Sequence, residues 1–151
     1  MSLRRTCAPA LGVVLALAAG GCGGSSSMSA QVLRTRAARI CSVATQRLNS
    51  IPTPQVPSAG ESFLRRGIAA VRPELAALSA IQPSGELGAQ FGKARDATEQ
   101  ELKVLQSSLK GLKAGNDPIV AFKTLQTELA PLETQASAAW GALGIRACAD
   151  T

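Results

Sequence analysis

Residues 87–122 read LGAQFGKARDATEQELKVLQSSLKGLKAGNDPIVAF, and this stretch determines the fold class. Its apolar residues recur at steps of three or four, which is the period of one helical face. Gly115 suits the left-handed position that ends a helix, and Asp117-Pro118 provides an N-cap and a first-turn proline for the next one. The stretch therefore predicts two amphipathic helices joined by a tight turn. The apolar face of the first is Leu87, Phe91, Ala94, Thr98, Leu102, Leu105, Leu109 and Leu112.

The same period continues on both sides of this stretch. The helix that follows Asp117 has the apolar face Ile119, Phe122, Leu125, Leu129, Leu132, Ala136, Trp140 and Leu143. We predict that it stops at Gly144 in a left-handed conformation, with Ile145 folding back onto its last turn. Upstream, the residues Leu33, Ala37, Ile40, Ala44 and Leu48 predict a helix that Asn49 and Pro52 end.

A further helix is predicted after the proline-rich connector Ile51 to Pro57. Ser58 and Glu61 have the spacing of a capping box, so we expect the helix to start there. Pro83 and Gly85 mark the turn that follows it. Its apolar face is Leu64, Ile68, Val71, Leu75 and Leu78.

Two prolines, Pro73 and Pro131, fall inside these predicted helices. Projected at 100° per residue, each lies on the side opposite the apolar face, where water can hydrate the freed carbonyls. We therefore expect two continuous helices that bend at proline. With short connections, the four helices of residues 30–151 predict an all-α, antiparallel up-down bundle, in which the first helix neighbours the fourth.

The N-terminus has the three parts of an export signal. Arg4 and Arg5 precede an apolar run at 11–19, which is too short to span a membrane, and Gly20 and Gly21 precede Cys22. The segment Leu17-Ala-Ala-Gly-Gly-Cys22 resembles a lipobox, with Ala19 where leucine is most frequent. We predict a lipoprotein signal peptide at 1–21, a lipidated Cys22 and a Gly/Ser tether at 22–29. The alternative is an ordinary secretory signal that is cleaved nearby.

Export also bears on the four cysteines, because thiols outside the cytoplasm can oxidise. Cys7 would leave with the signal and Cys22 would carry the lipid, which leaves Cys41 and Cys148 as a pair 107 residues apart. We expect a structural disulfide, for which the tail after Gly144 must fold back along the first helix. The alternative, a redox-active pair or two free thiols, lacks the CxxC spacing that lowers a thiol pKa.

Composition excludes most catalytic classes. The chain has no histidine, which removes the usual residues of serine and cysteine hydrolases, haem proteins and common zinc or di-iron sites. Paired carboxylates remain as candidates, yet we expect them to lie on solvated helix faces, where Glu99 and Lys103 are spaced to pair. These carboxylates are Glu99, Glu101, Glu128 and Glu133. We predict no enzyme activity, no cofactor and no metal site.

Positive charge is concentrated near the predicted anchor. The chain carries a net charge of +6, and residues 29–75 contain seven arginines against two glutamates. Arg34, Arg36 and Arg39 are candidates for contact with anionic headgroups or wall polymers, at roughly 1 kcal/mol per arginine; the alternative is an ordinary charged helix face. Aromatic residues make up only 3% of the chain, which argues against nucleic-acid binding. We interpret Trp140 as a core residue, with a pocket-lining role as the alternative.

The segment Ala138-Ala-Trp-Gly-Ala-Leu-Gly-Ile-Arg-Ala-Cys148, together with Ile40-Cys41-Ser42, resembles small lipoproteins of the envelope of high-GC Gram-positive (actinobacterial) bacteria. The resemblance implies a helical domain exposed in the envelope, with one disulfide and no assigned activity. We expect a lipoprotein anchored on the extracytoplasmic face of the cell membrane that serves as a structural or protein-interaction module. The alternative is a binding protein for a small apolar or lipidic ligand, and a pocket among the helices would favour it.

Overall fold

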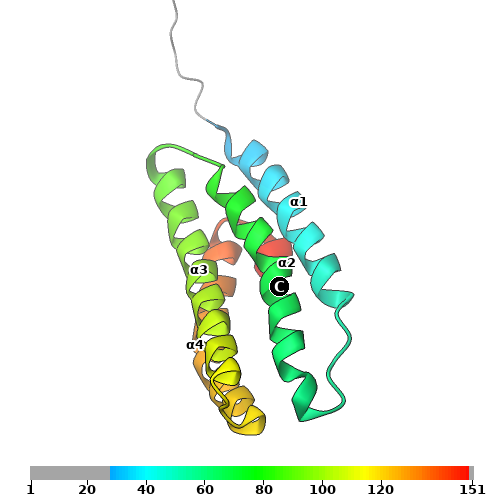
Figure 1. Cartoon of the computed structure of the whole chain (residues 1–151). Coiled ribbons are helices and arrows are strands. Elements are labelled where there is room, and N and C mark those ends of the chain that lie inside the picture. The colour runs from blue at the N-terminus through cyan, green and yellow to red at the C-terminus, as the bar shows by residue number, and fades with distance from the viewer. Residues whose placement is uncertain (1–27, 150–151) are drawn as a thin grey trace, which may run out of the picture.

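The computed structural model describes residues 28–149, and this part of the chain is all-helical, as predicted (Figure 1). The predicted signal peptide 1–21, Cys22 and residues 23–27 of the tether lie outside the described residues. The elements are α1 (Ala30–Asn49), the short 3₁₀ helix η1 (Pro57–Ala59), α2 (Gly60–Ser79), α3 (Gly85–Lys113), α4 (Pro118–Ala142) and α5 (Arg146–Ala149).

The turn chemistry in the sequence sets most helix ends. The side chain of Asp117 accepts hydrogen bonds from the backbone N–H groups of Ile119 (2.9 Å) and Val120 (3.0 Å), and Pro118 follows as the first residue of α4. Gly115 and Gly144 have positive φ angles of 92° and 71°, the left-handed conformation that ends α3 and α4 with little strain at glycine. These three predictions are confirmed.

The start of α2 differs from the prediction. Pro57 begins the turn η1, and α2 follows only at Gly60, with no side-chain hydrogen bond at its cap. The expected capping box of Ser58 and Glu61 is therefore wrong. Ser58 lies within η1, before α2 begins, and Glu61 forms an ion pair with Arg65 (3.7 Å), one helical turn further along α2. The ring of Phe122 on α4 occupies the space that a Cβ at Gly60 would need, so a larger residue at position 60 would have to displace this ring.

Each long helix packs against the next one along the chain, and α5 packs against both α4 and α1. Figure 1 shows α5 lying among the longer helices. Direct contact between α1 and α4 is sparse, unlike the neighbouring pair that the sequence predicted. The physical reason is α5, which takes the place beside α1 that α4 would otherwise fill.

The main core lies around Trp140, which is 1% exposed and meets the edge of the Phe91 ring (centroids 5.7 Å apart, 74° between planes). The interpretation of Trp140 as a core residue is confirmed. Pro73 and Pro131 are exposed and lie within continuous helices.

Ile119 was predicted on the apolar face of α4 but is 67% exposed, because it lies in the first turn of α4, which the other helices do not cover. The core cluster is Leu33, Ala37, Cys41, Leu78, Ile81, Phe91, Ala94, Ala97, Ala136, Trp140, Leu143, Ile145 and Cys148.

A disulfide joins Cys41 of α1 to Cys148 of α5, with Cα atoms 5.1 Å apart and both side chains buried. The turn after α4 brings the tail back, since the N–H of Ile145 donates to the carbonyl of Trp140 (3.0 Å). Arg34 of α1 donates from Nε to the carbonyl of Leu143 (2.8 Å), which ties α1 to the same turn. The predicted pairing and the folding back of the tail are both confirmed.

Candidate functional site

A cavity of about 820 Å³ lies beside the core, between α2, α3 and α4. Leu48 closes it from α1, and Cys148 and Ala149 border it from α5. The cavity lies on the side of the bundle where α1 and α4 are held apart, so α5 and its disulfide help to form it. Its apolar lining is contributed by Leu48, Val71, Leu105 and Leu129, and its acidic lining by Glu74, Glu101 and Glu133.

Glu74 is the most unusual side chain of the lining, because it is only 6% exposed and none of the described residues forms an ion pair or hydrogen bond with its carboxylate. Sequence analysis missed this residue. The signal was present, since Glu74 follows Val71 by three positions and precedes Leu78 by four, and so lies on the apolar face of α2. Although the residue is buried, its carboxylate oxygens are not among the fully buried polar atoms without a partner, so they reach the open space of the cavity.

Burial changes the titration of two of these carboxyl groups. Desolvation raises the pKa of Glu74 from 4.5 to about 7, with a further contribution from the nearby charge of Glu101. Desolvation likewise raises the pKa of Glu101 from 4.5 to about 7, with a contribution from Glu133. The negative charges of Glu101 and Glu133 thus oppose the ionisation of Glu74 and Glu101, respectively, each of which lies on a neighbouring helix.

The hydroxyl of Thr98 connects the cavity to the core. It accepts a hydrogen bond from the indole Nε1–H of Trp140 (3.1 Å) and donates to the carbonyl of Ala94 (3.4 Å). Thr98 lines the cavity, whereas Trp140 lies one layer deeper. The single tryptophan of the chain is therefore placed to report on events in the cavity.

The four carboxylates singled out from the sequence divide into two groups. Glu99 forms the predicted pair with Lys103 (2.7 Å), and Glu128 is exposed, both as expected of a solvated face. Glu101 is half-buried and lines the cavity, so the expectation of a solvated face is wrong for it. Glu133 is exposed and stands on the α4 rim of the same cavity. The position of Glu101 on the flank of its helix suggested exposure to water. In the structure α2 packs against α3, and Glu101 lies in the cavity lining between these helices.

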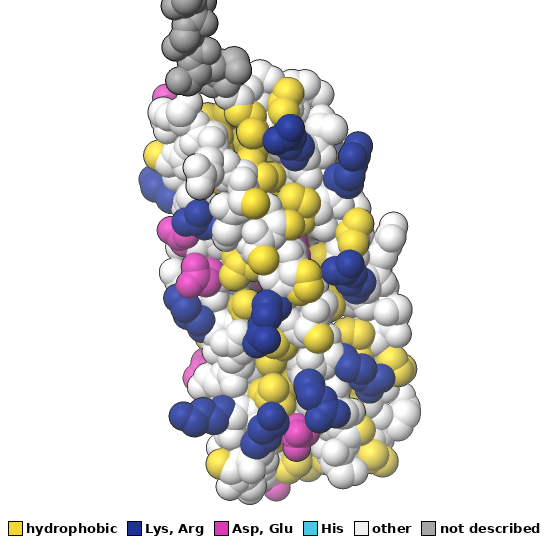
Figure 2. Space-filling view, turned by 45° about the horizontal axis from the view of Figure 1, so that its top comes forward, with side chains coloured by type: hydrophobic (Ala, Val, Ile, Leu, Met, Phe, Trp, Pro, Cys, Tyr) yellow, Lys and Arg dark blue, Asp and Glu magenta, His cyan; other side chains and the backbone are white. Residues whose placement is uncertain are grey.

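The three arginines of α1 that were singled out from the sequence, Arg34, Arg36 and Arg39, are exposed and have different surroundings. Arg34 is engaged with the carbonyl of Leu143, as described above, whereas Arg36 and Arg39 point to solvent from the outer surface of α1. Figure 2 shows lysine and arginine side chains scattered over one face of the molecule rather than gathered at one spot. A contact of these arginines with an anionic surface stays a prediction.

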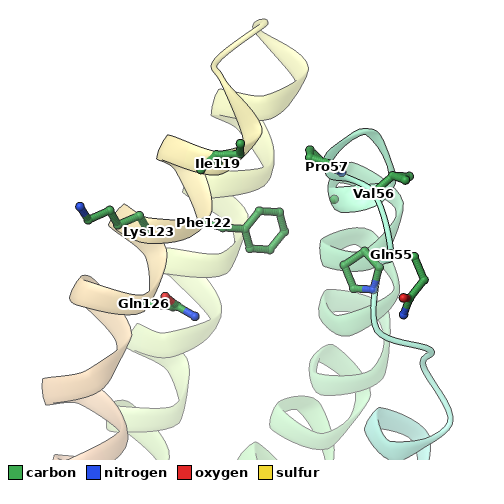
Figure 3. Close-up of a pocket in the computed structure, with 9 residues that line it drawn as sticks. Gln55, Val56, Pro57, Ile119, Phe122, Lys123 and Gln126 are labelled. Carbon is green, nitrogen blue, oxygen red and sulfur yellow. The ribbon is translucent and has the colours of Figure 1, made fainter.

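A second, smaller hollow of about 420 Å³ lies at the end of the bundle where α4 begins. Figure 3 shows the ring of Phe122 and the side chain of Ile119 on α4 facing Val56 and Pro57 across it. We call this hollow the end groove. Its rim is apolar and accessible, since Val56 and Ile119 are 55% and 67% exposed.

Within residues 28–149, no three His, Cys, Asp or Glu side chains are arranged to hold a metal ion. None of the described helices combines the length and hydropathy of a membrane-spanning segment. Comparisons with protein-family models, with curated proteins and with solved structures found no match for this chain.

Proposed function

We propose that this protein is an extracytoplasmic lipoprotein, held to the cell membrane by a lipid on Cys22, whose helical domain binds a small ligand in the cavity. The ordered signal features of residues 1–22 and the Gly/Ser run after them support the anchor. The absence of histidine from the chain and the apolar cavity lining support binding rather than catalysis.

The observation that carries the binding role is the cavity itself. Its volume of about 820 Å³ lies in the range typical of small-molecule sites, which are mostly apolar with a few polar groups. A purely structural bundle packs its interior to a density that leaves few voids larger than a water molecule. The sequence alone favoured an interaction module, and the cavity now makes ligand binding the better supported role.

An interaction role remains the second candidate, and the end groove supports it. Val56 and Ile119, which line the groove, are both more than half exposed. The groove lies at the end of the bundle opposite the first turn of α1 (Figure 1). For a chain tethered through its N-terminus, this end would face away from the membrane, toward a protein partner in the envelope.

We also infer that the four long helices run antiparallel in up-down order and that α2 and α4 bend at Pro73 and Pro131. Short connections between successive packed helices support the order. Exposed prolines inside continuous helices support the bends. A bent α4 would arch around the cavity instead of closing onto α1.

The anchor is tested by metabolic labelling with radioactive palmitate in the native host. Wild-type protein should incorporate the label and fractionate with membranes, whereas Cys22→Ala should do neither. Cys7→Ala, a matched change within the predicted signal, should behave like the wild type. Equal behaviour of wild type and Cys22→Ala would show that the protein is secreted without a lipid.

The binding role is tested by native mass spectrometry of full-length protein purified from its own membrane. We expect a bound small molecule that Ala138→Trp at the cavity rim reduces about tenfold, because the added ring blocks access. Ala142→Trp, also exposed on α4 but outside the cavity, is the control. Consistent absence of a small molecule, together with a co-purifying protein lost on Ile119→Asp, would establish the second candidate instead.

A further inference from the structure

Building on the proposed function, we infer that the ligand of the cavity is an organic cation, an ammonium group carried on an apolar body. Its charged end would sit between Glu74 and Glu101, with Glu133 at the entrance. The inference rests on three features of the lining, namely the sign of its charges, the isolation of Glu74 and the scarcity of hydrogen-bond donors.

The charges of the lining all have one sign. Glu74, Glu101 and Glu133 come from three different helices, and the described residues that line the cavity include no lysine or arginine. The ion pairs found in residues 28–149 join other carboxylates, those of Glu61, Asp96 and Glu99, to basic side chains on the surface. Although the chain has a net charge of +6, none of the described lysine and arginine side chains lines the cavity that contains Glu74.

Among the described residues 28–149, none forms an ion pair with Glu74, although its side chain is more than nine-tenths buried. Such a group is stabilised when an opposite charge comes within hydrogen-bond distance in the same desolvated space. An ammonium supplies this charge and three donors, which can be shared between the carboxylates of Glu74 and Glu101. The large apolar side chains of the lining, those of Leu48, Val71, Leu105 and Leu129, would then contact the hydrocarbon part of the same ligand.

An anionic ligand would find few donors in this cavity. The hydroxyl of Thr98 already donates to the carbonyl of Ala94, and that of Thr134 donates to the carbonyl of Ala130 (2.9 Å). Ser137 on the rim is the remaining hydroxyl of the lining. An anion would also meet three carboxyl groups of its own sign, so the lining selects against fatty acids and phosphates.

This assignment makes binding depend on pH. Among residues 28–149, the titratable groups that line the cavity are Glu74 on α2, Glu101 on α3 and Glu133 on α4, while α1 and α5 contribute only uncharged residues. Burial places the pKa values of Glu74 and Glu101 at about 7. A bound ammonium favours the ionised carboxylates and lowers these pKa values, so binding near neutral pH releases protons. Affinity should therefore rise from pH 5.5 to pH 8.

The experiment compares three probes that share one hydrocarbon body: cyclohexylmethylamine, cyclohexylmethanol and cyclohexanecarboxylate. Each is titrated into the full chain at pH 8 and pH 5.5, and binding is followed by calorimetry and by the fluorescence of Trp140. We expect the ammonium to bind about tenfold or more tightly than the alcohol at pH 8. Its affinity should fall about tenfold at pH 5.5, and calorimetry in buffers of different ionisation enthalpy should show proton release.

Two variants separate the carboxylates of the cavity from the general charge of the protein. Glu74→Gln should weaken the ammonium about tenfold at pH 8 and leave the alcohol unchanged, because only the counter-charge is lost. Glu128→Gln, exposed on α4 outside the cavity, should change neither. Circular dichroism checks that each variant is folded, and Glu101→Gln replaces Glu74→Gln if the latter is not.

The possible results distinguish a failure of the cationic ligand from a failure of the proposed binding function. If the alcohol or the carboxylate binds as tightly as the ammonium, or if Glu74→Gln leaves the ammonium unaffected, the cationic ligand is wrong while ligand binding stands. If none of the three probes binds and a small molecule still co-purifies from the native membrane, the cation is again wrong. If no probe binds and nothing co-purifies, the proposed function fails as well.

Discussion

Replacing Cys41 and Cys148 together with alanine is expected to lower the free energy of unfolding by about 4–5 kcal/mol. The disulfide closes a loop that spans 107 residues, and a loop of this length removes much conformational entropy from the unfolded chain. The loss is also structural, because α1 packs mainly against α2 and α5. Without the bond, only non-covalent packing holds the four-residue α5 to α1.

Urea unfolding followed by the fluorescence of Trp140 measures this effect, with and without a reductant. The reductant should lower the stability of the wild type to that of the double variant and leave the double variant unchanged. Cys22→Ala, which retains the disulfide, is the matched control. A reduction in wild-type stability of less than about 1 kcal/mol would show that α5 is held by packing alone.

The stability of the protein should fall as the pH rises from about 4.5 to about 7. In the unfolded chain the carboxyl of Glu74 ionises near its ordinary pKa of 4.5, whereas in the fold burial raises that pKa to about 7. Between these values the folded state binds more protons than the unfolded state, so each rise in pH favours unfolding. The titration of Glu74 alone should lower the free energy of unfolding by up to about 3 kcal/mol. This loss is complete once the pH is well above 7. Glu101 acts in the same direction.

Urea unfolding at pH 5 and pH 8 measures the difference directly. Glu74→Gln should be more stable than the wild type at pH 8 and should show a smaller decline between pH 5 and pH 8, because a neutral amide does not ionise and only the contribution of Glu101 remains. Glu128→Gln, exposed on α4, should keep the wild-type decline. A wild type as stable at pH 8 as at pH 5 would contradict the burial of an ionisable Glu74 without a partner.

The boundaries of α4 were predictable because local chemistry determines them. Asp117 caps the first turn of α4 with its own side chain, and Gly144 ends the helix through a backbone conformation that few other residues adopt. The disulfide was predictable by counting cysteines, because the predicted signal peptide and the predicted lipidation of Cys22 would leave Cys41 and Cys148 as one pair. The start of α2 was not, because the proline turn at Pro57 and the close approach of Phe122 to Gly60 override the capping-box pattern.

The sequence by itself determined the helical class, most of the residues of the core and the pairing of Cys41 with Cys148, since each follows from periodicity, turn chemistry or cysteine number. Only the tertiary structure decided which carboxylates are buried. In the sequence, Glu74 lies on the apolar face of α2 and Glu101 lies on the flank of the apolar face of α3, but whether water, a basic side chain or an empty space meets them depends on helices distant in the chain. Because α5 occupies the place beside α1, α4 stays off α1, and the space between the helices becomes an acidic cavity.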